Sequence, residues 1–111
     1  MGSLAESRRN LIVRFGRTMQ LRRPVAGGQA TTVTITAFSS RYTPGEIEGA
    51  IQQGDERVQI LHEEIAAAGW NSVRTSDWLL KDGKQQSIEG AIPVYEGDVI
   101  IGHTLWIRGP R

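Results

Sequence analysis

The last third of the chain most constrains what this sequence can fold into, because it contains three apolar runs separated by two tight-turn signals. It extends from Asp77 to Gly109, and its turn signals are Lys81-Asp82-Gly83-Lys84 and Tyr95-Glu96-Gly97-Asp98. Asp-Gly supplies the positive φ values that a tight hairpin turn needs, and Glu96-Gly97-Asp98 separates two apolar runs in the same way. The sequence therefore predicts a C-terminal β-meander over residues 77–109.

The final run of this meander alternates between two faces, as a strand does. One face is nearly all branched aliphatic and is expected to form the wall of a core: Val99, Ile101, His103, Leu105 and Ile107. The other face carries a large aromatic, a small residue and a charge: Ile100, Gly102, Thr104, Trp106 and Arg108. We expect this second face to be partly exposed or to meet another protein.

An N-terminal helix is predicted over residues 3–15, within an N-terminal helix or arm of residues 1–16. Ser3 can cap it, and Glu6 follows at the capping-box spacing. Apolar residues recur at near-helical spacing and Gly16 follows as a C-terminal glycine would: Leu4, Leu11, Ile12 and Phe15. The alternative is a strand formed by LIVRF, residues 11–15.

Further strands are predicted by alternation upstream of the meander. Residues 18–23 and 30–38 form an expected hairpin, and residues 56–62 form another strand with Val58, Ile60 and His62 on one face. A helical turn is expected over residues 63–69, followed by a polar connection over residues 70–76. Residues 39–55 contain Pro44 and read as one long mobile loop, of a length that is usually functional.

These elements predict a mainly β protein, a small antiparallel β-barrel or sandwich of about six strands with an N-terminal helix. A length of 111 residues favours a single domain, residues 1–111.

Charges are unevenly distributed along the chain. Six arginines and one acid occupy the first quarter, whereas acids dominate the middle, although the formal net charge is only +1. Such an uneven distribution favours oriented contact with a complementary surface, including a second copy of the chain.

Residue types that carry chemistry are sparse. The chain has no cysteine, which excludes a disulfide framework and a cysteine nucleophile. His62 and His103 lack metal-binding neighbours of the HxH or HExxH kind, and we interpret them as residues at the edge of a core. No phosphate-binding glycine motif and no GxSxG elbow is present. We therefore expect no enzyme activity, no cofactor, no metal and no small-molecule substrate.

A role in protein–protein contact is the hypothesis that the residues support best. Trp106 and Arg108 are types enriched at interface centres and share a strand face, although Trp106 could instead cover the base of the N-terminal helix. The long loop carries Arg41, Tyr42 and Ile47 and could order on a partner. Two alternatives stay open: a small barrel that binds nucleic acid, and an adaptor that binds a peptide by strand addition.

No run is long enough to span a bilayer, and the N-terminus lacks the apolar segment of a signal peptide. The expectation is a protein made in the cytoplasm, without a membrane partner.

The order of motifs resembles the small head–tail joining proteins (neck, or head-completion proteins) of tailed bacteriophages and prophages. The resemblance covers roughly residues 11–109. It rests on Phe15-Gly16-Arg17, the TMQLRR and threonine-rich strands, Gln53-Gly54-Asp55 before ERVQIL, Lys81-Asp82-Gly83, Val94-Tyr95-Glu96-Gly97-Asp98 and Trp106-Ile107-Arg108-Gly109.

This resemblance implies a non-enzymatic virion protein, made in the bacterial host cytoplasm, that assembles into a ring between the portal and the tail. Its partners would be copies of itself and the portal, adaptor and tail proteins, and nucleic acid would be met only as DNA passing through the ring. The contacts that the resemblance implies are the loop, residues 40–55, and the N-terminal arm. Our candidate interface residues are Arg41, Tyr42, Ile47, Glu48, Ile51, Asp55, Arg14, Arg17, Trp106 and Arg108.

Overall fold

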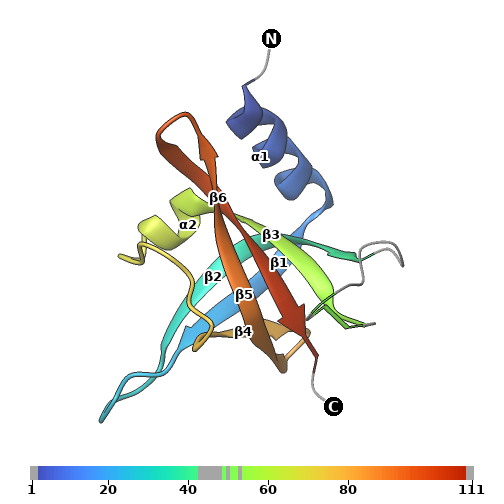
Figure 1. Cartoon of the computed structure of the whole chain (residues 1–111). Helices are drawn as coiled ribbons and strands as arrows, with labels where there is room; N and C mark the ends of the chain where they lie inside the picture. The colour runs from blue at the N-terminus through green and yellow to red at the C-terminus, as the bar shows by residue number, and fades with distance from the viewer. Residues whose placement is uncertain (1–2, 43–48, 50, 53, 110–111) are drawn as a thin grey trace.

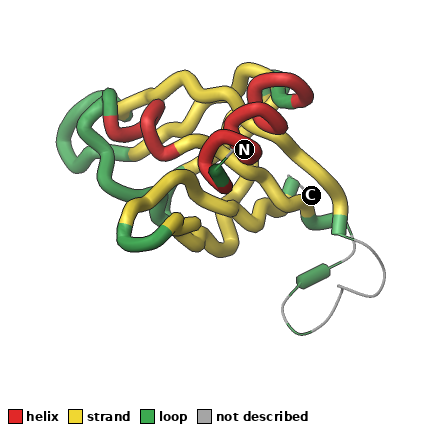
Figure 2. Tube along the Cα trace, turned by 90° about the horizontal axis from the view of Figure 1, so that it is seen from above, coloured by secondary structure: helices red, strands yellow, loops and turns green. Residues whose placement is uncertain are grey.

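The computed structural model describes residues 3–42, 49, 51–52 and 54–109 of the chain. Within these residues it places two helices and six strands: α1 (Leu4–Phe15), β1 (Arg17–Arg23), β2 (Thr31–Arg41), β3 (Glu56–Leu61), α2 (His62–Ala66), β4 (Trp78–Lys81), β5 (Lys84–Glu96) and β6 (Val99–Arg108). Both helices lie at the upper end of the barrel in Figure 1, and the view from above in Figure 2 shows helical segments in front of the strands.

The six strands form one closed antiparallel barrel in the order β1-β2-β3-β6-β5-β4. Closure depends on the pairing of β1 with β4, in which Gln20–Arg22 lie opposite Trp78–Leu80. The predicted hairpin of the first two strands and the predicted C-terminal meander are both confirmed. The mainly β fold with an N-terminal helix is also confirmed, and the barrel rather than the sandwich is the form it takes.

The barrel interior is filled by the side chains that face inward at alternate positions of the strands. In β2, for example, Val33, Ile35 and Ala37 are buried while Thr32 and Thr34 are exposed. Burying one such aliphatic side chain contributes about 1.5–3 kcal/mol. The core cluster comprises Met19, Leu21, Val33, Ile35, Ala37, Val58, Ile60, Ile65, Trp70, Val73, Leu79, Ile88, Leu105 and Ile107.

The meander turns adopt the backbone that their sequence predicts. Asp82 and Gly83 have φ values of 54° and 77°, and Gly97 has a φ of 61°. The expected core wall of β6 is only partly right, because Val99 is 65% exposed. The ladder with β3 begins only at Gly102, so the start of β6 extends beyond the barrel in the projecting β5–β6 hairpin of Figure 1.

Helix α1 forms where predicted, so the strand alternative for residues 11–15 is wrong. The Ser3 side chain accepts a hydrogen bond from the Glu6 N–H, as the capping box requires. Gly16, however, has a φ of −83° and is not a left-handed cap. It is needed for space, since a Cβ there would lie 2.3 Å from the Ile12 carbonyl oxygen.

The expected apolar face of α1 is largely wrong as well. Only Ile12 is buried in this helix. Leu4 and Phe15, which the helical spacing assigned to the same face, are 54% and 62% exposed. The side of α1 that faces the barrel carries Ala5, Arg8 and Ile12, of which only Ile12 is fully buried and Arg8 is polar.

Two boundaries and the burial of one connection differ from the sequence-based expectation. β2 continues through Arg41, so residues 39–41 belong to the sheet and not to the long loop. His62 begins α2 and is not the last residue of β3, while Leu61 is buried instead. The polar connection over residues 70–76 contributes Trp70 and Val73 to the core. Most of the remaining loop lies outside the described residues, so its predicted mobility stays a prediction.

Candidate protein-interaction surfaces

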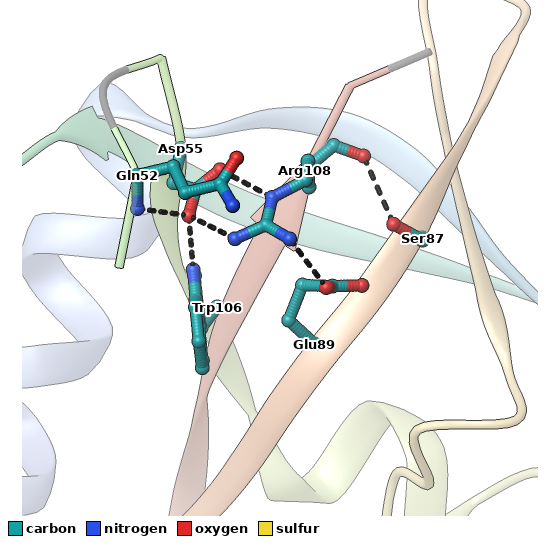
Figure 3. A network of polar contacts seen from close by, with 6 residues as sticks. All are labelled: Gln52, Asp55, Ser87, Glu89, Trp106 and Arg108. Carbon is teal, nitrogen blue, oxygen red and sulfur yellow. Dashed lines mark hydrogen bonds and ion pairs between the residues drawn. The ribbon is translucent and has the colours of Figure 1, made fainter. Parts of the chain in front are cut away.

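The carboxyl-terminal root of the predicted loop is fixed to the barrel by a buried carboxylate. Asp55 is 2% exposed and receives two hydrogen bonds from the Arg108 guanidinium, at 2.9 Å to Oδ1 and 3.0 Å to Oδ2. The Trp106 indole N–H donates to Oδ2 at 2.7 Å, and the Gln52 backbone N–H donates to the same atom at 2.8 Å. Figure 3 shows these groups converging on Asp55 from β6 and from the loop. We call this cluster the loop anchor.

Electrostatics favour the charged form of the loop anchor. The Arg108 hydrogen bonds, with those from Gln52 and Trp106, lower the pKa of Asp55 to about 2 even though burial acts in the opposite direction. Arg108 also donates to Glu89 of β5 at 2.9 Å. The cluster therefore ties the loop, β5 and β6 together through charge-assisted hydrogen bonds, which are the stronger kind.

Trp106 is positioned by its neighbours on the sheet. It lies opposite Gly90 of β5, where the register shifts, and a Cβ at Gly90 would lie 3.3 Å from the indole ring. The indole is partly buried, so one part of the ring packs on Gly90 while the rest reaches the surface. The polar edge of the ring is directed to Asp55, and the alternative in which Trp106 covers the base of α1 stays a prediction.

The structure thus brings together three of the candidate interface residues, Asp55, Trp106 and Arg108. Sequence reasoning placed Trp106 and Arg108 on one strand face but did not connect Asp55 with them. Their polar atoms are used within the chain, so a partner would meet the partly exposed surfaces of Trp106 and Arg108 and not the carboxylate. Their contact with another protein stays a prediction.

The amino-terminal root of the loop lies on the neighbouring strands. Arg41 ends β2 and is exposed, and it is paired in register with Glu56 of β3. Tyr42 follows it, and the Arg57 guanidinium lies 4.8 Å from the centroid of its ring. Because Arg57 is also the register partner of Trp106, both roots of the loop meet on the same part of the sheet.

The other candidates are more dispersed. Ile51 precedes Gln52 of the loop anchor in the chain and is partly buried. Ile47 and Glu48 lie outside the described residues. Arg14 is exposed on α1. Arg17 is exposed at the start of β1 and forms a surface ion pair with Asp82 at 3.2 Å. Surface pairs of this kind contribute about 0–1 kcal/mol, so Arg17 stays available for exchange of partners.

Sequence reasoning missed a second polar junction, in which Arg8 attaches α1 to the barrel. Its guanidinium donates to the Gln59 side chain at 2.6 Å and to the carbonyl oxygens of Ile60 and His103 at 3.3 and 2.9 Å. Gly102 provides the space, because a Cβ there would lie 2.5 Å from the Arg8 Nε atom. A glycine inside the apolar run VIIGHTLWI was the sequence signal for such a close approach.

Beneath Arg8 the two histidines of the chain meet. The His62 Nδ1 atom lies 3.0 Å from the His103 Nε2 atom. His103 is 1% exposed, and burial, with the adjacent His62 and Arg8, lowers its pKa to about 4. The interpretation of His103 as a core histidine agrees with this burial, but its pairing with His62 could not be read from a separation of 41 residues.

Several large apolar side chains are exposed on α1 and on the projecting β5–β6 hairpin. The two elements are joined by a hydrogen bond from the Leu4 N–H to Glu96 at 2.6 Å. Single exposed apolar residues are common on protein surfaces. The exposed side chains are Leu4, Val13, Phe15, Ile92, Tyr95 and Val99.

Within the described residues, no group of three or more His, Cys, Asp or Glu side chains could hold a metal ion. A widely open hollow of about 410 Å³ lies between α1, α2 and the start of β6. No helix in the described part of the chain is long and apolar enough to cross a membrane.

Comparisons with protein-family models, curated proteins and solved structures gave no match.

Proposed function

We propose that the protein is a non-enzymatic structural protein of a tailed-phage particle, joining the head at its portal to the tail through protein–protein contacts and ring assembly. The resemblance of its motif order to head–tail joining proteins suggests the class. The observation that carries the proposal is the loop anchor, which fixes the carboxyl-terminal root of residues 42–55 to the barrel beside Trp106. Such a rigid base suits a segment whose task is contact with a partner.

Ring assembly needs two different surfaces on each copy. In a ring, a patch on one copy binds a different patch on the next copy, which is a heterologous contact. The described residues offer such a pair. One surface is charged and aromatic, formed by Arg41, Tyr42 and Trp106 around the loop anchor. The other is formed by the exposed apolar side chains of α1 and the β5–β6 hairpin. In the assembled particle the partners would be further copies, the portal or adaptor, and the tail.

Particle incorporation tests this function directly. We expect Arg41→Glu, and separately deletion of residues 42–52, to leave the barrel folded and to abolish incorporation into phage particles. Arg74→Glu is the matched control, because Arg74 is also exposed but lies on the connection before β4, away from the loop. Normal incorporation of the deletion variant would refute the proposal, as would equal defects in the two charge-reversal variants.

One observation favours the strand-addition alternative. β5 pairs with β4 only over Lys84–Ser87, so in the described structure residues 88–96 have a strand partner on one side alone. An unpaired edge is a template for another strand. Pro93 interrupts this edge, however, and proline is a common means of blunting one. Peptide binding that Ile92→Lys abolishes, with particle incorporation intact, would support this alternative over the first.

A further inference from the structure

The contact between α1 and the barrel is largely polar. Ile12 is the only buried residue of the helix, and Arg8 donates three hydrogen bonds to the barrel. The Arg8 Nε atom is buried without a hydrogen-bond partner, and burial lowers the pKa of this guanidinium. A buried donor without a partner disfavours the docked state. The docked state of α1 therefore carries this cost at the Arg8 junction.

The group beneath Arg8 is a pair of imidazoles, the side chains that most readily change charge in the physiological pH range. His62 begins α2, His103 lies on β6, and the two ring nitrogens are 3.0 Å apart. A hydrogen bond at this distance needs one N–H and one lone pair, so the pair cannot remain bonded when both rings are protonated. The His103 carbonyl oxygen is at the same time an acceptor for Arg8.

We propose that α1 is a pH-sensitive arm, docked on the barrel while the His62–His103 pair holds at most one proton and released when both rings are charged. Double protonation places three cations at one junction, on α1, α2 and β6. Their mutual repulsion in a poorly hydrated site is strongest while Arg8 stays inserted. Withdrawal of Arg8 with the helix relieves it and leaves the barrel strands in place.

Three of the four nearby carboxylates are engaged elsewhere. Glu63 of α2 forms an ion pair with Arg9 of α1, and Glu64 accepts hydrogen bonds from Thr36 of β2. The fourth, Glu6 of α1, lines the open hollow together with His62. From β5, Glu96 accepts from Leu4 at the start of α1. Within the described residues, none of these carboxylates has a hydrogen bond to either imidazole.

A spin label tests the release in the intact protein. The chain has no cysteine, so Asn10→Cys gives a single labelling site on the exposed side of α1. By NMR we expect the label to broaden barrel amides near α1 at pH 7.5 and to lose this effect as the pH falls toward 4, where His103 takes up its proton, while the amides of β4 keep their shifts. The docked population should fall by up to tenfold per pH unit for each additional proton taken up.

The double variant His62→Asn, His103→Gln is the control, because each amide keeps a polar group near the position of the bonded ring nitrogen. We expect its docking to be independent of pH over the same range. A response that persists in this variant would assign the effect to Glu96 or another group and overturn the proposal. The imidazole resonances of the parent protein give a second readout: titration of both rings without loss of the label's effect would also overturn it.

Discussion

Replacement of Asp55 by asparagine tests the loop anchor most sharply, because the side chain keeps its shape and loses only its charge. The substituted amide would present one carbonyl oxygen and one NH₂ group to four donors: two from Arg108, one from Trp106 and one from Gln52. At least one donor then faces another donor at hydrogen-bond distance. The expected result is a large loss of stability with the barrel still folded.

The magnitude follows from two independent considerations. A pKa lowered from 3.8 to about 2 corresponds to about 2 kcal/mol in favour of the charged carboxylate. Removing one partner of a fully buried ion pair costs about 3–5 kcal/mol, but Arg108 is 20% exposed and keeps Glu89, which places this site at the lower end. We therefore expect Asp55→Asn to reduce the free energy of unfolding by about 2–3 kcal/mol.

Urea denaturation at pH 7, followed by tryptophan fluorescence, measures this loss. The matched control is Asp82→Asn, which removes the exposed Arg17–Asp82 pair and keeps a residue that tolerates the φ of 54° at this turn. It should change stability by less than about 1 kcal/mol. Equal effects of the two substitutions, or a loss below about 0.5 kcal/mol for Asp55→Asn, would refute the account of the loop anchor.

The anchor also predicts a dependence on acid. Because the pKa of Asp55 is depressed in the folded state, its contribution is fully present above pH 3.8 and is lost as the pH falls toward 2. The stability difference between the parent protein and Asp55→Asn should therefore shrink over this interval. Urea titrations between pH 5 and pH 2 measure it, and a difference that stays constant would contradict the assignment.

Three further outcomes are expected. Gly102→Ala should expel Arg8 and lower stability by about 1–3 kcal/mol, since the new Cβ would lie 2.5 Å from both the Arg8 Nε atom and the Ile60 carbonyl oxygen. Hydrogen exchange should show loss of protection in α1 and at the adjoining part of β3. Gly16→Ala should be at least as severe, because its Cβ would meet the backbone carbonyl of Ile12, and thermal unfolding would measure the change. The depressed pKa of His103 should make stability fall as the pH is lowered from 6.5 to 4, by at most about 1.4 kcal/mol per pH unit, as urea midpoints would report.

Local patterns were sufficient to predict most strands, because each depends on neighbours in the chain. Alternation in β2 and β6 and the Asp82-Gly83 turn are properties of a few adjacent residues, and all three formed as expected. The capping of α1 by Ser3 is equally local. Each of these strands has an apolar face that must be buried, and a closed barrel buries all of these faces together.

Features that depend on distant partners could not be predicted in the same way. Asp55 read as a turn residue because its partner Arg108 lies 53 residues away. Arg8 read as a solvated charge because its acceptors include strand carbonyls, which leave no pattern in the sequence. Trp70 and Val73 read as part of a polar connection because their neighbours are polar, yet they fill the core from outside the strands.

The seam between β1 and β4 has a consequence for how the barrel is made and lost. β1–β2 and β4–β5–β6 each join strands that are close in sequence, whereas the seam brings Gln20–Arg22 against Trp78–Leu80 across more than half of the chain. Closing so long a loop carries the greatest entropic penalty, so the seam is expected to form late in folding. If β1 and β4 separate before the other strands, the edges of both strands become unpaired. The opened sheet can then pair with the sheet of a neighbouring molecule. The β1–β4 pairing is the shortest in the barrel. We expect the same pairing to limit both the rate of folding and the resistance to aggregation.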